Sequence, residues 1–360
     1  MALDRITLSR FRNHADTALD DTRRFNLLVG ENGAGKTNVL EAISLLAPGR
    51  GLRRAALADL PSQSGGGGFT VGASLAQAEG EPVRLGTFVR ADLPGRRKVR
   101  VNGAEASAAS LGEWLAIGWL TPAMDRLFAD SAGARRRFVD RMTLALEPGH
   151  ARHAARYEGA LRERNRLLGD EREPDPAWLD GIEVQLAEHG AELAQARLRT
   201  IARLSDALAA VPDEPFARPL LAIEPGGPAD EAALATALRE GRRADRRAGR
   251  TLTGPHRDEL LVTMAGKSMP AAECSTGEQK AMLIAITLAH AELAAQGRPG
   301  LLLLDEVAAH LDPVRRAALF ERLREGAAQV WLTGTEMTPF AEIAEEAAVW
   351  RVREGAVERV

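Results

Sequence analysis

The sequence has almost no cysteine, few aromatic residues and no long apolar run. Its 360 residues contain one cysteine, Cys274, so no internal disulfide can form, which fits a reducing cytoplasm. No stretch approaches the roughly 18 apolar residues of a membrane helix, and the first residues lack the apolar core of a secretion signal. These absences predict a cytoplasmic protein that does not bind membranes.

Lysine is nearly absent as well. Only four of the 47 basic residues are lysines, namely Lys36, Lys98, Lys267 and Lys280, and the rest are arginines. A codon bias explains this composition, because alanine and glycine are also abundant. A lysine kept against that background is still a candidate for a chemical requirement. The net charge of −3 excludes a polycation, so any binding of nucleic acid must use local basic patches.

The chain is long enough for two domains, and its patterns change along the sequence. An apolar stretch at 24–30 predicts a strand, and the segments FTVGASL, VRLGTFV and KVRVN predict antiparallel hairpins within an antiparallel β subdomain at about 65–103. The glycine run at 65–68 is interpreted as a loop. Residues 123–210 are predicted to be helical, 211–230 form proline-rich breaks, and strands and helices alternate after about 250.

Residues 30–37 read GENGAGKT and match the phosphate-binding pattern G-x-x-x-x-G-K-[ST] in full. They follow a predicted strand and open a predicted helix, as the pattern requires, which argues against a glycine-rich turn without a ligand. Lys36 is expected to reach the β- and γ-phosphates of ATP, and the Thr37 hydroxyl to bind Mg²⁺. The backbone N–H groups that would surround these phosphates belong to Gly30, Glu31, Asn32, Gly33, Ala34 and Gly35.

Four leucines at 301–304 precede Asp305 and Glu306. An uninterrupted apolar run predicts a buried strand in a parallel sheet. At its end, Asp305 is expected to hold Mg²⁺ through water, and Glu306 to orient or deprotonate the attacking water. Two carboxylates after a strand also fit a solvated strand end. Together with the phosphate loop, however, they predict ATP hydrolysis with Glu306 and Lys36 as catalytic residues.

The spacing of these motifs indicates a split nucleotide-binding fold. Asp305 lies 269 residues after Lys36, but only 30 residues after Ser275. We therefore predict a discontinuous head formed by residues 1–122 and 250–360, with residues 123–249 inserted as a helical lobe. The stretch ECSTGEQKAML at 273–283 describes a helix N-terminus capped by serine or threonine, and such ends attract anions, above all phosphate.

Several stretches carry a resemblance to known families. STGE at 275–278 is similar to the signature motif of ABC-type ATPases, and AHLD at 309–312 to their D-loop. The split layout resembles the heads of SMC-type proteins without a long coiled coil. More narrowly, the chain resembles the RecF family of bacterial DNA replication and recombinational repair proteins. The matching stretches are FRN at 11–13, GKTNVLEAI at 35–43, GRRKVRVNG at 95–103, the run from Pro122 to Asp140 that ends in RRRFVD, ERNRLL at 163–168, GPHRDEL at 254–260, STGEQKAML at 275–283 and LLLLDEVAAHLD at 301–312.

The chain also departs from these families. Ala123 follows Pro122 where an acidic residue is expected, and no Q-loop glutamine is identified. The stretch WLTGTEMT at 331–338 ends a strand where many ABC ATPases carry a switch histidine, but it contains none. These departures favour a slow switch over a transport motor.

The resemblance implies an α/β fold, namely a split, SMC-like head of the ABC-type P-loop ATPases with an inserted helical lobe. It implies a weak, DNA-dependent ATPase that dimerises on ATP and binds DNA that is double-stranded, gapped or a single-strand/double-strand junction, with single-stranded DNA as an alternative. RecR, with RecO, would then help to load the RecA recombinase, and hydrolysis would release the dimer. Arg12, Ser275, Gly277 and Asp312 are implied nucleotide contacts, with Ser275 and Gly277 at the γ-phosphate held by Lys36 of the other protomer.

Two arginine-rich segments are candidate DNA contacts. Residues 131–168 contain nine arginines and four acidic residues, and residues 241–258 contain six arginines and two. Backbone phosphates require such cations and no particular base contacts. Solvated helix faces with local ion pairs explain the same pattern for any single arginine. Arg135–Arg137 also fit a structural role, and GPHRDEL a place in the nucleotide pocket.

Three functions compete at this point. The first is an ATP-gated DNA-binding repair protein. The second is the motor subunit of a transporter, which usually has a far shorter gap between the phosphate loop and the carboxylates. The third is an ATP-binding scaffold without catalysis, against which Glu306 argues. We favour the first.

Overall fold

The computed structural model of the protein describes residues 3–62, 66–76, 80–172 and 174–360, apart from the side chain of His310. The chain forms two compact units, Met1–Asp125 with Leu283–Val360, and Arg126–Met282. We predicted that the inserted lobe runs from 123 to 249. The second unit extends further, to Met282, because strands at 219–224 and 259–264 pair with each other beside its helices.

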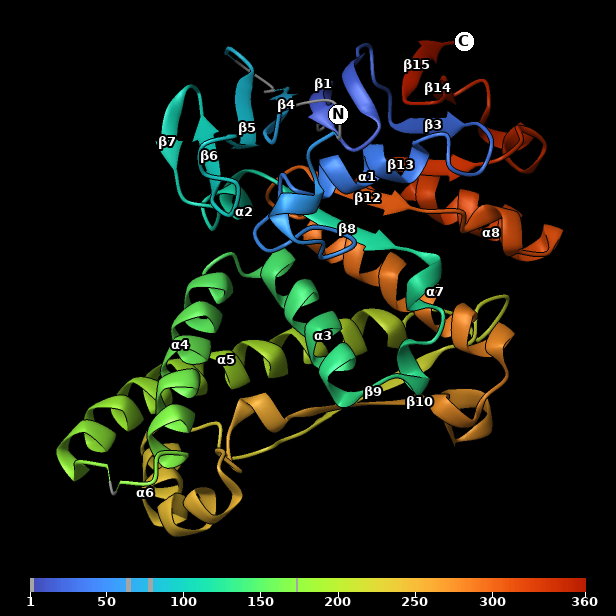
Figure 1. Ribbon diagram of the computed structural model, residues 1–360. Coiled ribbons are helices and arrows are strands. Elements are labelled where there is room, and N and C mark those ends of the chain that lie inside the picture. Colours follow the sequence, from blue (N-terminus) through green and yellow to red (C-terminus); the bar gives the residue numbers. More distant parts are fainter. Residues whose placement is uncertain (1–2, 63–65, 77–79, 173) are drawn as a thin grey trace. The chain divides into compact units, whose positions relative to one another are not determined.

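A six-stranded sheet, in the order β15-β14-β3-β13-β12-β8, forms the centre of the first unit (Figure 1). Its strands are β3 (Phe25–Val29), β8 (Ala116–Leu120), β12 (Gly300–Leu304), β13 (Gln329–Gly334), β14 (Ala347–Arg353) and β15 (Ala356–Arg359). Neighbours pair in parallel except β14 and β15. Strands β8, β12 and β13 are buried throughout, as apolar runs in parallel sheets are. The carboxyl ends of β3, β13 and β12 therefore lie side by side at one edge of the sheet.

A second, antiparallel sheet of the same unit has the order β2-β1-β4-β5-β6-β7. Its strands are β1 (Leu3–Phe11), β2 (His14–Leu19), β4 (Phe69–Leu75), β5 (Val83–Val89), β6 (Arg97–Val101) and β7 (Ala104–Ala106). The predicted strands FTVGASL, VRLGTFV and KVRVN form β4, β5 and β6. Part of the glycine run predicted as a loop, residue 65, and part of the predicted β subdomain, residues 77–79, lie outside the described residues.

Helices accompany the two sheets of the first unit. They are α1 (Lys36–Ser44), α2 (Leu111–Trp114), α8 (Pro313–Glu325) and the C-terminal part of α7 (Thr276–Ala294). Helix α1 contacts both β1 of the antiparallel sheet and β13 of the parallel sheet, so it lies between the two. Its Val39, Leu40 and Ile43 are fully buried in the hydrophobic core that both sheets share. This packing fixes the start of α1, where the phosphate loop ends.

The second unit is mostly helical. Its elements are α3 (Ala132–Leu146), α4 (His150–Leu168), α5 (Pro176–Ala209), α6 (Glu231–Ala248), β9 (Pro219–Glu224), β10 (Glu259–Met264) and β11 (Met269–Pro270). Helix α5 spans 34 residues and begins at Pro176, with the Asp175 side chain accepting the N–H of Ala177 as its cap. It packs against α3, α4, α6 and β9. Strand β9 lies inside the predicted break at 211–230; sequence reasoning missed it because its partner β10 is distant in sequence.

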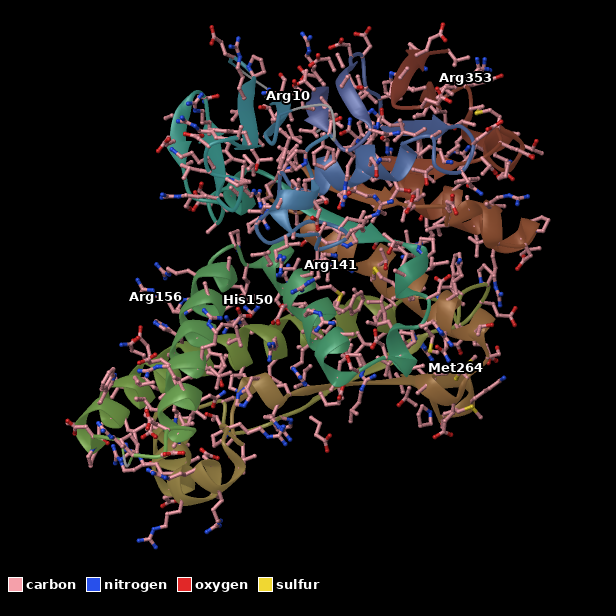
Figure 2. All side chains as sticks on the ribbon, viewed as in Figure 1. Arg10, Arg141, His150, Arg156, Met264 and Arg353 are labelled. Atoms are coloured by element: carbon pink, nitrogen blue, oxygen red, sulfur yellow. The ribbon has the colours of Figure 1, made fainter. Side chains whose placement is uncertain are left out.

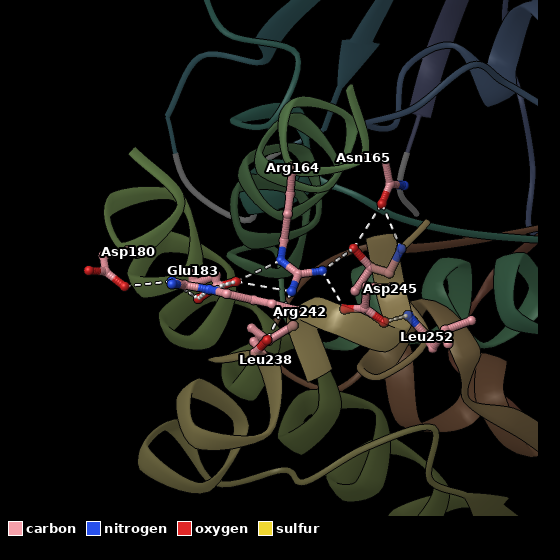
Figure 3. A network of polar contacts seen from close by, with 9 residues as sticks. Arg164, Asn165, Asp180, Glu183, Leu238, Arg242, Asp245 and Leu252 are labelled. Atoms are coloured by element: carbon pink, nitrogen blue, oxygen red, sulfur yellow. Dashed lines mark hydrogen bonds and ion pairs between the residues drawn. The ribbon is translucent and has the colours of Figure 1, made fainter. Parts of the chain in front are cut away.

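A buried polar network holds the helices of the second unit together (Figure 3). Arg164 on α4 is fully buried and donates to Glu183 on α5 and to Asp245 on α6. It also donates to Thr251, 2.8 Å away, and to the carbonyl of Leu238. A buried charge without partners costs free energy, so the role of Arg164 is to stabilise the fold of this unit.

Among the residues that the structure describes, no helix is both long and apolar enough to span a lipid bilayer.

Candidate functional site: a nucleotide-binding edge of the parallel sheet

The phosphate loop connects β3 to α1, as the sequence predicts. Gly33 and Gly35 have φ angles of 82° and 119°, which favour glycine. A Cβ atom on Gly35 would lie 2.9 Å from the side chains of Asn13 and His14, so this position has no room for a side chain. Gly35 is the N-cap of α1, and no side chain caps this helix end among the described residues. The first N–H groups of α1 are therefore available to an anion.

Lys36 and Thr37 occupy the first turn of α1. Lys36 is buried, with 4% of the residue exposed. Its ammonium group donates to the carbonyls of Gly30 (2.7 Å) and Glu31 (2.9 Å), so it lies over the loop. Burial lowers the pKa of Lys36, against the opposing charges of Glu306 and Asp305. The Thr37 hydroxyl donates to Asp305 at 2.9 Å. Glu31 and Asn32, by contrast, are exposed at the tip of the loop.

Two turns contact the phosphate loop, one from the N-terminal part of the sequence and one from the C-terminal part. In the β1–β2 turn, Asn13 Nδ2 donates to the Ala34 carbonyl at 3.0 Å, and His14 Nε2 lies 3.1 Å from the Gly35 carbonyl. In the β14–β15 turn, the Gly355 N–H donates to the same Ala34 carbonyl at 2.9 Å. A Cβ on Gly355 would lie 2.0 Å from the Asn13 carbonyl oxygen, so the two turns touch each other. Sequence reasoning missed this support.

Arg12 was predicted to contact the nucleotide. Its guanidinium makes two hydrogen bonds of 2.9 Å to the carboxylate of Glu41 on α1 and a third to the Asp59 carbonyl. Glu41 is 1% exposed and also pairs with Arg53, 3.2 Å away. Arg12 therefore neutralises a buried carboxylate in the helix that follows the phosphate loop. A nucleotide contact by Arg12 stays a prediction.

Asp305 and Glu306 follow β12 directly, and β13 supplies a residue that joins them. Asp305 Oδ1 accepts hydrogen bonds from Thr37 (2.9 Å) and from the hydroxyl of Thr333 (2.8 Å), the penultimate residue of β13. The Thr333 hydroxyl in turn accepts the N–H of Glu306 at 2.9 Å. Burial raises the pKa of Asp305, while the hydroxyl groups of Thr333 and Thr37 oppose this shift. The structure thus brings Lys36, Thr37, Asp305 and Glu306 to one edge of the sheet.

These groups fit a magnesium-bound nucleoside triphosphate. Magnesium takes hard oxygen ligands and is usually bound through one or two carboxylates together with substrate phosphates. The Thr37 hydroxyl and the Asp305 carboxylate already share a hydrogen bond, so they can serve as neighbouring oxygen ligands. The uncapped end of α1 and the Lys36 ammonium supply the positive field that phosphates require.

Ser275 and Gly277 lie in the second unit, at the start of α7. The Ser275 N–H and hydroxyl both donate to Glu278 Oε2, at 2.9 and 2.8 Å, and the Glu278 N–H points back to the serine oxygen. Lys267 forms an ion pair with the other oxygen of Glu278. This is a capping box, which the S-x-x-E spacing should have revealed. The hydrogen bond from Lys267 and those from Ser275 lower the pKa of Glu278 to about 2.

Gly277 and Asp312 have different surroundings. Gly277 is exposed, and a Cβ atom there would meet nothing within 4 Å, so nothing in this chain requires a glycine at the position. Asp312 is the N-cap of α8 and accepts the N–H of Arg315 at 3.0 Å. Both residues were predicted to contact nucleotide. Their exposure leaves them accessible, and the predicted role remains untested by the geometry of one chain.

The two arginine-rich segments contain both structural and exposed arginines. Arg164 is buried in the network of Figure 3, Arg135 pairs with Glu259 at 2.6 Å, and Arg242 pairs with Glu183. GPHRDEL at 254–260 belongs to the second unit, where its Asp258 pairs with Arg197. Seven exposed arginines of these segments form no ion pair within the described part of the chain, and Arg156 projects outward from α4 (Figure 2). They are Arg137, Arg152, Arg156, Arg243, Arg247, Arg250 and Arg257.

Comparison with known proteins places this site in context. Residues 2–358 match the family described as the RecF/RecN/SMC N terminal domain. The DNA replication and repair protein RecF of Mesorhizobium japonicum is 46% identical over 99% of this chain and 97% of its own length. That of Brucella suis biovar 1 is 45% identical over 99% and 95%.

Solved structures agree with the fold. The structure described as the recombination mediator protein RecF-ATP in the RecFOR pathway superimposes with a TM-score of 0.86, at 23% identity, over 100% of this chain and 97% of that one. An SMC head bound to the C-winged helix domain of ScpA gives a TM-score of 0.57 at 17% identity, over 100% and 97%. The predicted fold, a split ABC-type ATPase head of the SMC kind with an inserted helical lobe, is therefore confirmed.

Proposed function

The chain belongs to the RecF family of DNA replication and repair proteins, and we propose that it is an ATP-dependent DNA-binding protein of recombinational repair. Two chains dimerise on gapped or junction DNA when both hold ATP, and slow hydrolysis releases them. The proposal depends above all on one observation. A series of hydrogen bonds runs from Thr37 through Asp305 and Thr333 to Glu306. It connects the phosphate loop to the candidate catalytic carboxylate.

Each residue of this edge has a distinct task. The N–H groups at the start of α1 and the Lys36 ammonium bind the β- and γ-phosphates. Thr37 and Asp305 would hold Mg²⁺, and the bound ion would neutralise charge on the phosphates. Glu306 orients the attacking water and accepts its proton at the side-chain carboxylate. The fixed positions of Lys36 and Asp305 support binding, and the lack of a switch histidine is compatible with slow turnover.

Dimerisation requires a second surface that binds the γ-phosphate. Ser275 and the N–H groups near Gly277 present an exposed helix end, and the missing side chain at Gly277 allows close approach. In a two-fold dimer each chain would supply one phosphate loop and one such helix end, so two nucleotides would be enclosed. Loss of the γ-phosphate would remove this contact and open the dimer.

DNA binding is assigned to the exposed arginines of the second unit. Arg156, Arg243, Arg247 and Arg257 are available for backbone phosphates, whereas the buried arginines already have partners. The solved relative is described as a mediator in the RecFOR pathway. By analogy we assign RecR as a direct partner, with RecO and the RecA recombinase downstream. A chromosomal DNA partner implies that the protein acts in the cytoplasm.

The decisive experiment measures molecular mass and retention on gapped DNA with ATP and Mg²⁺. The wild-type protein should become a dimer and bind DNA more tightly when ATP is added. Lys36→Arg should fail to form a productive dimer, and Glu306→Gln should form one that persists. Lys98→Arg, at an exposed pair with Glu105, is the matched control and should behave as wild type. A wild-type protein that stays monomeric under all conditions refutes the mechanism. Glu306→Gln with wild-type turnover would show that another group accepts the proton, and no turnover in either protein would favour a binding scaffold instead.

A further inference from the structure

Thr333 lies in the stretch WLTGTEMT at 331–338, at the strand end where many ABC ATPases carry a switch histidine. It stands near the end of β13, directly between the phosphate-loop strand β3 and the carboxylate strand β12. The residue is 1% exposed, so its hydroxyl must find partners within the protein. Its neighbour Gly334 accepts the N–H of Gly30, the first residue of the phosphate loop, at 3.2 Å. The end of β13 thus contacts both halves of the nucleotide site.

A larger residue cannot stand at the next position. A Cβ atom on Gly334 would lie 2.3 Å from a ring carbon of Phe340, which is fully buried. The packing of Phe340 therefore excludes a histidine at Gly334 without a rearrangement of the core. Thr333 therefore supplies the side chain that contacts the site from the end of this strand.

The Thr333 hydroxyl uses both of its hydrogen-bonding capacities. It donates its proton to Asp305 Oδ1 at 2.8 Å and accepts the N–H of Glu306 at 2.9 Å. One oxygen atom therefore fixes the side chain of one carboxylate residue and the backbone of the next. Glu306 has a φ angle of 55°, a conformation that non-glycine residues rarely adopt and that needs support from its surroundings.

We propose that Thr333 is a positioning residue that sets Asp305 and Glu306 in a fixed relation, so that metal binding and proton acceptance are arranged by one hydroxyl group. The inference rests on the proposed function of the same site. Thr333 does not touch the reacting atoms; it acts through the two carboxylate residues. Loss of its hydroxyl removes the acceptor of the partly buried N–H of Glu306 and one of two donors to Asp305 Oδ1.

The test compares Thr333→Val, which removes the hydroxyl at nearly constant volume, with Thr333→Ser, which retains it. Turnover of ATP in Thr333→Val should fall about 10- to 100-fold, as expected for a misplaced catalytic group, and Thr333→Ser should recover most of it. Two further readouts follow. The ATP-driven dimer of Thr333→Val should last longer after ATP is removed, because hydrolysis releases it. The dimer should also need a higher Mg²⁺ concentration to form, and this readout does not depend on turnover.

Controls separate this role from a general effect on folding. Thr287→Val removes another buried threonine hydroxyl, one that donates only to the Leu283 carbonyl within α7, and should leave turnover and dimer lifetime unchanged. If Thr333→Val fails to fold, Thr333→Ala and Thr333→Ser lack the same methyl group and differ by one oxygen, so their comparison decides. Wild-type turnover in the variants without the hydroxyl overturns the inference. A wild-type protein that neither dimerises nor hydrolyses ATP overturns the proposed function itself.

Discussion

The carboxylate of Glu278 accepts hydrogen bonds from both the backbone N–H and the hydroxyl of Ser275, so the predicted signature helix begins with its own anion in place. The start of α1 differs, because no side chain caps it in the described structure. Two helix ends that are both expected to serve a phosphate are therefore prepared in opposite ways. One is open, and at the other the carboxylate of Glu278 is already hydrogen-bonded to Ser275.

Glu278 and Lys267 should affect dimerisation in opposite directions. Glu278→Gln removes the negative charge that an incoming γ-phosphate would meet, while Lys267→Ala leaves that charge without its cation. We expect Glu278→Gln to lower the ATP concentration for half-maximal dimerisation by up to about 5-fold, and Lys267→Ala to raise it, because charges at a helix end interact with the partial charges of its free N–H groups. Mass measurements across an ATP titration report both. Identical titrations for the three proteins would show that the capping pair has no part in dimerisation.

Gly277→Ala separates stability from assembly. Alanine favours a helix over glycine by up to about 1 kcal/mol, and the position has open space, so the free energy of unfolding should rise slightly. Dimer formation with ATP should nevertheless weaken, because the new methyl group stands where the phosphate must approach. Gly181→Ala is the matched control, since Gly181 is an exposed helical glycine of α5 with equally open space. It should gain stability without any change in dimerisation; equal dimerisation in both variants contradicts the assigned contact.

Asp140 gives the second unit a pH-dependent stability. Burial alone would raise the pKa of Asp140, but the hydrogen bond from His150 and the charge of Arg197 outweigh it and lower this pKa to about 2. Because the pKa lies below the value of an unfolded aspartate, the stabilisation is complete above pH 4 and is lost as the pH falls towards 2. We expect Asp140→Asn to lower the free energy of unfolding by about 2 kcal/mol at pH 7, and by much less near pH 2.

Urea unfolding followed by circular dichroism at a series of pH values measures this difference. Asp206→Asn, on the exposed face of α5, should match wild type at every pH. A constant difference between Asp140→Asn and wild type across the whole range would show that the carboxylate contributes through packing and not through its charge.

The exposed arginines of α6 should bind DNA phosphates. Replacing Arg243 and Arg247 with glutamine removes two cations that no carboxylate neutralises in the described chain. We expect weaker binding of gapped DNA and a salt dependence, as log K against log salt, that is shallower by about 2, because each lost phosphate contact contributes roughly 0.9. Arg90→Gln, whose arginine pairs with Asp92 in a surface turn, is the control. An unchanged slope would move the DNA site to another surface.

Local pattern predicted the parts of the site that are contiguous in sequence. The phosphate loop, the leucine strand and the two carboxylates were recognised because each is a short stretch with its own chemistry, and parallel strands bring their carboxyl ends together. Thr333 was not recognised, since a single threonine at a strand end has no distinctive signature until its neighbours in the sheet are known. Likewise, the sequence around Arg164 does not show that this arginine is buried while Arg156 is exposed. Its burial follows from the positions of Glu183 and Asp245 in the folded chain.

The two turns that meet behind the phosphate loop have a consequence for biosynthesis. The Ala34 carbonyl takes one donor from Asn13, made early, and one from Gly355, made more than three hundred residues later. Strands β13 and β14, which flank β3 on both sides, also come from the C-terminal part of the sequence. A nascent chain that still lacks these segments has the sequence of the nucleotide site without its shape. We therefore expect a chain cut before these segments to lose ATP binding, although the sequence of its phosphate loop is intact.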